Sequence, residues 1–207
     1  SAGKPMEALA DNPDYQAWRK FPAGAKVTYV WRSLTSIRPG SEELMGYRPT
    51  IRSTFTMDAI DDEQAHLWLG EIVYDSPTGQ AHPPHETEMA YASKIAASTA
   101  GRRAVASRHS RGAQSASEST TSGEETLELG GRAIATHWEE VTRNYPNKKE
   151  VTRTWTSDEV PSGLVRRTEM TVERNRVYGR ETLVESVHGT SHDFSLPREP
   201  LIDGPAV

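Results

Sequence analysis

The sequence contains no cysteine among its 207 residues. This absence excludes a disulfide framework, a thiol nucleophile and any zinc or iron–sulfur site built on cysteine ligands. No apolar run approaches the roughly 20 residues that a membrane-spanning helix needs, so we expect no transmembrane segment. The chain also lacks a phosphate-binding glycine loop, a dinucleotide fingerprint and the G-x-S-x-G motif of many hydrolases. We therefore expect no bound cofactor, and a non-catalytic protein is the favoured interpretation.

Large apolar side chains are scarce as well. Hydrophobic residues make up 35% of the chain and charged residues 26%, which favours a thin structure with one solvent-exposed face. The net charge of −5 gives no reason to expect nucleic acid as a partner. The arginines within 102–111 and 166–180 are interleaved with serine or glutamate and are typical of a solvated surface.

What the sequence does contain is a short helix signal followed by alternating strands. In "DNPDYQAWRKF", Asn12 is suited to cap a helix and Pro13 to occupy its first position. From residue 26 onward, apolar and polar residues alternate with the period of two that a half-buried strand requires. The first half of the chain predicts three such strands and a plausible fourth at "ETEMAYASKI".

The second half predicts five more strands between residues 124 and 188. Gly130-Gly131, Pro146-Asn147, Pro161-Ser162-Gly163 and Arg174-Asn175 mark the turns, and such short links force antiparallel neighbours. The expected fold class is therefore mainly β (α+β). Its form is a curved antiparallel β-meander or half-barrel of eight to ten strands with a short N-terminal helix.

A chain of this length fits one β-rich domain over residues 1–207. Within it we expect an N-terminal tail at 1–11, a flexible low-complexity loop at 96–123 and an extended proline-rich tail at 190–207. The loop is predicted because residues 96–123 contain almost no large apolar side chain, so little burial would offset the entropy of ordering them.

The stretch "GEETLELGGRAIATHWEEV", followed by a charged hairpin and "TWTSDEVPSGLVRR", resembles a pattern in secreted bacterial proteins of the LolA/LolB-like and TapB-like kind. The resemblance covers residues 123–188. The sequence departs from the pattern at Thr136-His137, where a cysteine often lies, and at Ser162, where glycine is usual. The resemblance implies a secreted or periplasmic protein whose signal peptide has been removed, with a curved sheet folded partly around a helix. In LolA-like relatives the concave face holds acyl chains of lipoproteins.

Aromatic residues provide the candidate binding site. Each one alone is better explained as part of the core, but as a set they could line an apolar groove on the concave face. The predicted ligand-binding residues are Tyr29, Trp31, Phe55, Trp68, Trp138 and Trp155.

The stretch "AHPPHETE" provides a weaker, metal-binding candidate. Its His82, His85 and Glu86 combine imidazole and carboxylate ligands that suit zinc or copper. An extended proline-rich segment would hold the two imidazoles far apart, so a solvated loop is the favoured interpretation.

The segment "TSDEVPSG" contains Ser157, Asp158 and Glu159. These residue types occur in catalytic sites, but serine and aspartate are also favoured in turns. We interpret them as a turn.

Three functions remain open from the sequence. The leading hypothesis is an exported, non-catalytic module that binds an apolar small molecule, a lipid or a lipidated protein. The second is a structural or interaction subunit that engages a protein partner, or assembles with itself, through its tails and sheet edges. The third is a metal-dependent enzyme that uses the His82/His85 loop.

Overall fold

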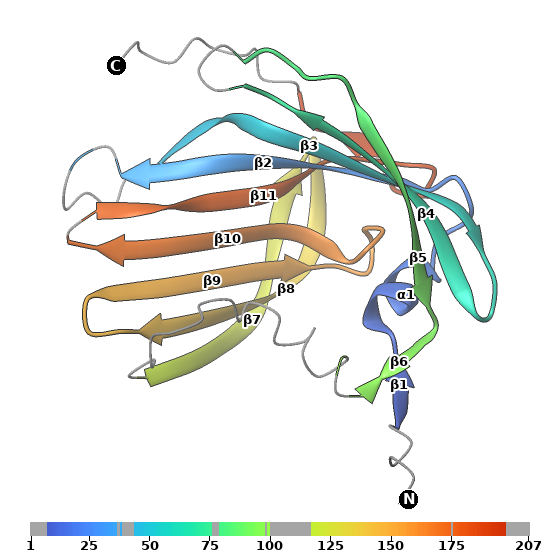
Figure 1. The fold of residues 1–207 in the computed structure, drawn as a ribbon, viewed down its shortest axis with the longest axis horizontal. Coiled ribbons are helices and arrows are strands. Elements are labelled where there is room, and N and C mark those ends of the chain that lie inside the picture. Colours follow the sequence, from blue (N-terminus) through green and yellow to red (C-terminus); the bar gives the residue numbers. More distant parts are fainter. Residues whose placement is uncertain are drawn as a thin grey trace, which may run out of the picture.

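The architecture is an open, strongly curved antiparallel sheet with one short helix (Figure 1). It was obtained as a computed structural model, which describes residues 8–36, 38, 44–75, 79–97, 99, 117–174 and 176–197. The sheet has ten strands and does not close into a barrel. The predicted fold class is thus confirmed.

Helix α1 spans Pro13–Trp18 and begins as its sequence predicts. The Asn12 side chain accepts a hydrogen bond from the backbone N–H of Asp14 at 3.1 Å, and Pro13 follows it directly. The strands are β1 (Leu9–Asp11), β2 (Lys26–Ser36), β3 (Leu44–Ile60), β4 (Gln64–Val73), β5 (His85–Ala92), β6 (Lys94–Ala96), β7 (Ser117–Leu129), β8 (Arg132–Asn144), β9 (Lys148–Thr156), β10 (Leu164–Glu173), β11 (Arg176–His188) and β12 (Phe194–Ser195).

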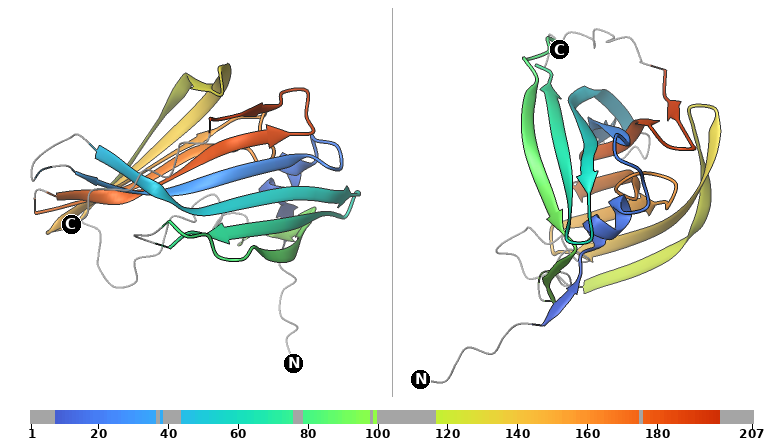
Figure 2. Two further views of the ribbon diagram at one scale, coloured as in Figure 1. Left: turned by 90° about the horizontal axis from the view of Figure 1, so that it is seen from above. Right: turned by 90° about the vertical axis from the view of Figure 1, so that its right-hand side faces the viewer.

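The strand order is β5-β4-β3-β2-β11-β10-β9-β8-β7, with β12 added beside β11. Two meanders, β2–β5 and β7–β11, therefore meet where the first and last long strands pair. Figure 2 shows β4 and β5 on one side of the molecule, the β7–β8 hairpin on the other, and α1 between them.

Strand register divides the sheet into two faces. Neighbouring strands place Phe55 beside Val27 and Met57 beside Leu67. Val27, Met57 and Leu67 share a buried cluster with Tyr15 and Trp18 of α1, and Phe55 packs against it. We name this side the helix face. The next residue along each strand points to the opposite side, which we name the pocket face; it carries Thr28, Val30, Arg52 and Thr54.

Three predicted boundaries need correction. Leu9–Asp11 forms β1 and pairs with β6, so these three residues are not part of a tail, while residues 1–7 lie outside the described part of the chain. Residues 117–123 belong to β7 and not to the expected loop, because each of them pairs with a residue of β8. The C-terminal tail also contains a strand, since Phe194 pairs with Val187 and is 8% exposed. Residues 198–207, and 98 and 100–116 of the loop, lie outside the described part of the chain.

The single-domain organisation stays a prediction, and limited proteolysis tests it. Cleavage between residues 97 and 117 should leave two fragments that co-elute, because β2 from one pairs with β11 from the other and both supply the buried cluster. Two fragments that separate in native size-exclusion chromatography and each retain a folded β-sheet spectrum would contradict a single domain.

Candidate functional site

A row of small side chains runs across the pocket face. The ladder pairs Gly70 with Thr54, Thr54 with Thr28, Thr28 with Ser186, and Ser186 with Ser195. These five residues come from five adjacent strands and share one face, because directly paired residues project to the same side. Small side chains in one row leave the sheet surface hollow at this level.

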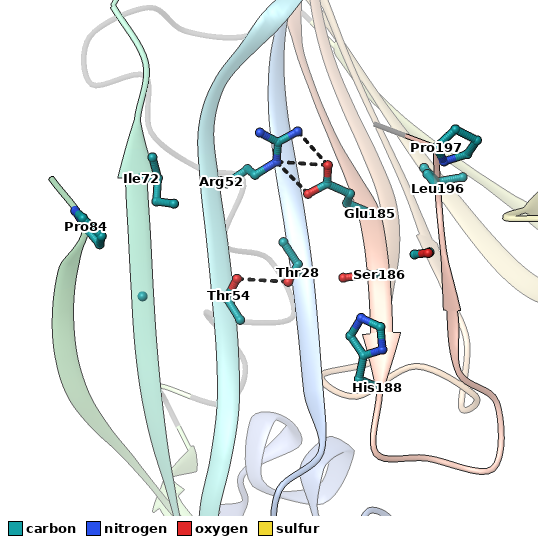
Figure 3. A pocket seen from close by; sticks show the side chains of 12 residues that line it. Thr28, Arg52, Thr54, Ile72, Pro84, Glu185, Ser186, His188, Leu196 and Pro197 are labelled. Atoms are coloured by element: carbon teal, nitrogen blue, oxygen red, sulfur yellow. Dashed lines mark hydrogen bonds and ion pairs between the residues drawn. The ribbon is translucent and has the colours of Figure 1, made fainter. Parts of the chain in front are cut away.

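The hollow is a pocket of about 630 Å³ (Figure 3). Beyond the small residues, Ile72 and Pro84 line one side, while Leu196 and Pro197 line the other. The volume lies within the range of about 300–1,000 Å³ that small-molecule sites occupy. The segment around β12 is held in place by Leu196, whose N–H donates to the Glu185 carbonyl at 2.7 Å.

The pocket contains one ion pair, between Arg52 and Glu185. The Arg52 Nε donates to Glu185 Oε2 at 2.7 Å, its second terminal nitrogen donates to Oε1 at 2.7 Å, and its first donates to the Tyr74 hydroxyl at 2.6 Å. The side chains of Arg52 and Glu185 are only 17% and 13% exposed. The hydrogen bonds that Arg52 donates to Glu185 raise the pKa of Arg52 above its usual value. The guanidinium therefore stays protonated, and the Glu185 carboxylate balances its charge.

The polar groups of the pocket are arranged for binding. The Thr28 and Thr54 hydroxyls lie 2.9 Å apart and hydrogen-bond to each other, so neither is paired with a general base as an activated nucleophile would be. A hydroxyl can donate and accept, so the row formed by Thr54, Thr28, Ser186 and Ser195 can bind a ligand hydroxyl or carbonyl.

A second hollow, of about 680 Å³, lies near the corner at Ser157. Its lining includes the carboxylates Glu124, Glu125, Asp158 and Glu159, but Ala135 is its only apolar side chain. Its lining is therefore acidic, which disfavours an anionic ligand. Ser157 itself shapes the turn, because its hydroxyl accepts from the Glu159 N–H at 3.2 Å; this supports the turn interpretation.

The six predicted aromatic residues do not form one site. Tyr29 and Trp155 belong to the buried core cluster, Phe55 and Trp138 pack against it, and Trp31 and Trp68 lie outside it. Tyr29, Trp31 and Phe55 share the helix face, where Tyr29 is 4% exposed and its ring makes an edge contact with Phe55 at 6.1 Å. The Tyr29 hydroxyl is 2.6 Å from Ser162 Oγ and donates to the Leu164 carbonyl at 2.8 Å. Burial raises the pKa of this phenol. Tyr29 therefore belongs to the core.

Trp138 and Trp155 lie on the pocket face, directly paired between β8 and β9. They occupy the far end of the row that begins at Arg52 and runs through Val30, Leu183 and Arg166, so they do not line the pocket. The Arg153 guanidinium lies 4.0 Å from the Trp138 ring centre and 4.9 Å from that of Trp155. The Trp155 indole N–H donates to Glu125.

Trp68 is separate from both groups. It pairs with Thr56 and Glu88, follows the buried Leu67 and is 45% exposed. The strand register places Tyr29, Trp31 and Phe55 on one face of the sheet and Trp68, Trp138 and Trp155 on the other, so the six rings do not line a single groove. Whether any of them contacts a ligand stays a prediction.

The three predicted metal ligands do not point toward a common site. His82 Nε2 lies 2.6 Å from Asp75 Oδ1, whereas His85 Nε2 lies 3.1 Å from the Thr87 hydroxyl. Glu86 follows His85 on β5 and so projects to the other face. Within the described ranges, no group of three or more histidine, aspartate or glutamate residues is placed to hold a metal ion.

No protein-family model matches this chain, and no curated protein sequence does either. The chain is similar to two solved structures. One is a protein from Bacteroides fragilis described as exported and as having a YmcC-like fold, with a TM-score of 0.39 and 9% identity over 81% of this chain and 97% of that one. The other is a protein from Parabacteroides distasonis described as a lipoprotein, with a TM-score of 0.40 and 10% identity over 82% of this chain and 98% of that one.

At these scores neither likeness supports a statement about function. No family model supports the LolA/LolB-like or TapB-like resemblance. In the part of the chain that the structure describes, no helix combines the length and the apolar character needed to cross a bilayer.

Proposed function

We propose that this protein is an exported, non-catalytic binding module that holds a small amphiphilic molecule, or the acyl chain of a lipidated protein, in the pocket between β4 and β12. The observation that carries the proposal is the row of small residues from Gly70 to Ser195, with apolar side chains on both sides of it. Such a surface offers apolar contact at its walls and hydrogen bonds along its floor, which is the usual composition of a small-molecule site.

The proposal differs from the sequence hypothesis in its location. The ligand lies on the pocket face, whereas Tyr29, Trp31 and Phe55 occupy the helix face, where Tyr29 and Phe55 contribute to the core. The export part of the proposal rests on the sequence resemblance of residues 123–188 alone.

A pocket-filling substitution tests the proposal. Gly70 has no unusual backbone angle, and a Cβ atom added there would meet only the Thr54 carbonyl oxygen, at 4.0 Å. Gly70→Phe should therefore fold and place a ring in the pocket. We expect wild-type protein to bind the uncharged apolar dye Nile red and Gly70→Phe to bind it at least about tenfold more weakly.

The matched control is Ala90→Phe. Ala90 pairs with His66 on the same face, is exposed, and lies outside the pocket lining. This variant should bind Nile red as the wild type does. Equal binding by Gly70→Phe and wild type, or no binding by the wild type, would contradict the proposal.

The sheet edges favour a second candidate, a subunit that pairs with another chain. Strand β7 is 13 residues long, and no described strand pairs with its outer side. An unpaired edge of this length can accept a further strand. However, Glu118, Glu124, Glu125 and Glu128 lie along it, and charged side chains are a common protection against self-pairing. The pocket is therefore the better-supported site.

A further inference from the structure

The two charges on the pocket floor, Arg52 and Glu185, compensate each other. Arg52 directs Nε and one terminal nitrogen to Glu185 and the other terminal nitrogen to Tyr74. With side chains only 17% and 13% exposed, the pair is largely removed from water. A charged ligand that reached this pair would lose part of its hydration without gaining an unpaired counter-ion from Arg52 or Glu185, which disfavours its binding there.

Three other titratable groups lie near the pocket, and all three are exposed. His188 lines the pocket, Lys26 pairs with His188 on the same face, and Glu86 pairs with Gly70 at the pocket edge. Charges in contact with water are screened and act weakly over distance. The selectivity of the pocket floor is therefore set by the Arg52–Glu185 pair and the hydroxyl row.

We infer that the pocket selects uncharged amphiphiles that carry a hydroxyl or carbonyl group, and that Glu185 sets this preference by neutralising Arg52. The inference rests on the proposed function. The ligand's polar group hydrogen-bonds to the row of Thr54, Thr28, Ser186 and Ser195, while its apolar part contacts Ile72 and Leu196. Without the Glu185 carboxylate, Arg52 would become a partner for an anionic ligand.

Three probes of equal chain length test the preference: octanol, octanoate and octylammonium. Each is titrated into full-length protein at about pH 8.5, where an imidazole is neutral, and binding is followed by the NMR shifts of the Thr28, Thr54 and Gly70 amides. We expect octanol to bind at least about tenfold more tightly than either charged probe.

Glu185→Gln tests the cause of the preference. The amide keeps an oxygen that can accept from Arg52 but removes the compensating charge, so the affinity for octanoate relative to that for octanol should rise at least about tenfold. The matched control is Glu71→Gln, which makes the same change in net charge on the helix face, where Glu71 accepts from the Ser53 hydroxyl at 3.0 Å. It should leave the order of the three probes unchanged.

The outcomes distinguish ligand binding in the pocket from the preference for uncharged ligands. If none of the probes shifts the pocket amides and Nile red also fails to bind, the proposed function fails. If octanoate binds the wild type as tightly as octanol, the pocket remains a binding site and the inference about neutral ligands is overturned. The wild-type series decides this even if Glu185→Gln does not fold.

Discussion

Trp155→Ala is expected to lower the free energy of unfolding by about 3–5 kcal/mol, the usual cost of truncating a buried aromatic residue. Trp155 is 5% exposed, and its indole N–H donates to Glu125. The guanidinium groups of Arg153 and Arg166 lie 4.9 and 5.0 Å from the ring centre. Truncation leaves a cavity between strands and removes both cation–π contacts. Denaturant unfolding followed by far-ultraviolet circular dichroism measures the effect.

Trp68→Ala is the matched control, because it removes the same side chain from a position that is 45% exposed. Its cost should not exceed about 1 kcal/mol, since most of the ring already contacts water. Nile red binding by the Trp155 variant, measured where it remains folded, should be unchanged. Equal destabilisation by the two substitutions, or a selective loss of dye binding in the Trp155 variant, would contradict a structural role for Trp155.

The second large effect concerns the ion pair of the pocket. Arg52→Met should destabilise the protein by about 2–4 kcal/mol, because it leaves the Glu185 carboxylate, 13% exposed, without its partner. The expected loss of stability is smaller than for a fully buried ion pair, because Arg52 and Glu185 keep some contact with water. Chemical denaturation at neutral pH provides the measurement.

The double variant Arg52→Met/Glu185→Leu isolates the interaction. Replacing both charges by apolar side chains removes the desolvation penalty along with the attraction, so most of the lost stability should return. If the two single effects simply add in the double variant, the side chains are not coupled and the account of the pocket's electrostatics is wrong.

Much of the fold follows from local patterns. Alternation with a period of two predicts the long strands, and Gly130 and Gly131, with φ of 60° and 76°, mark the β7–β8 turn where the sequence places it. The pairing of β2 with β11 joins residues that are far apart in the chain, such as Thr28 and Ser186. No short-range signal specifies such a contact, so two meanders could not be distinguished from one.

The site was not predicted because its signal is the absence of large side chains. Thr28, Thr54, Gly70 and Ser186 each occupy an unremarkable polar position in their own strands, and only the register aligns them. The aromatics are conspicuous in the sequence, yet Tyr29 and Trp155 are buried members of the core cluster. Strand 117–123 was missed for a similar reason: its partner, β8, supplies the apolar contact, since Trp138 lies across the backbone of Gly123.

Native mass spectrometry of protein isolated without detergent from the cells that naturally make it tests the central claim most directly. Wild-type protein should carry one uncharged amphiphilic molecule per chain, which gentle activation releases. Gly70→Phe protein, prepared in the same way, should be free of that molecule. A wild type that carries no such ligand, or a Gly70→Phe variant that carries the same ligand to the same extent, would contradict binding in the pocket between β4 and β12.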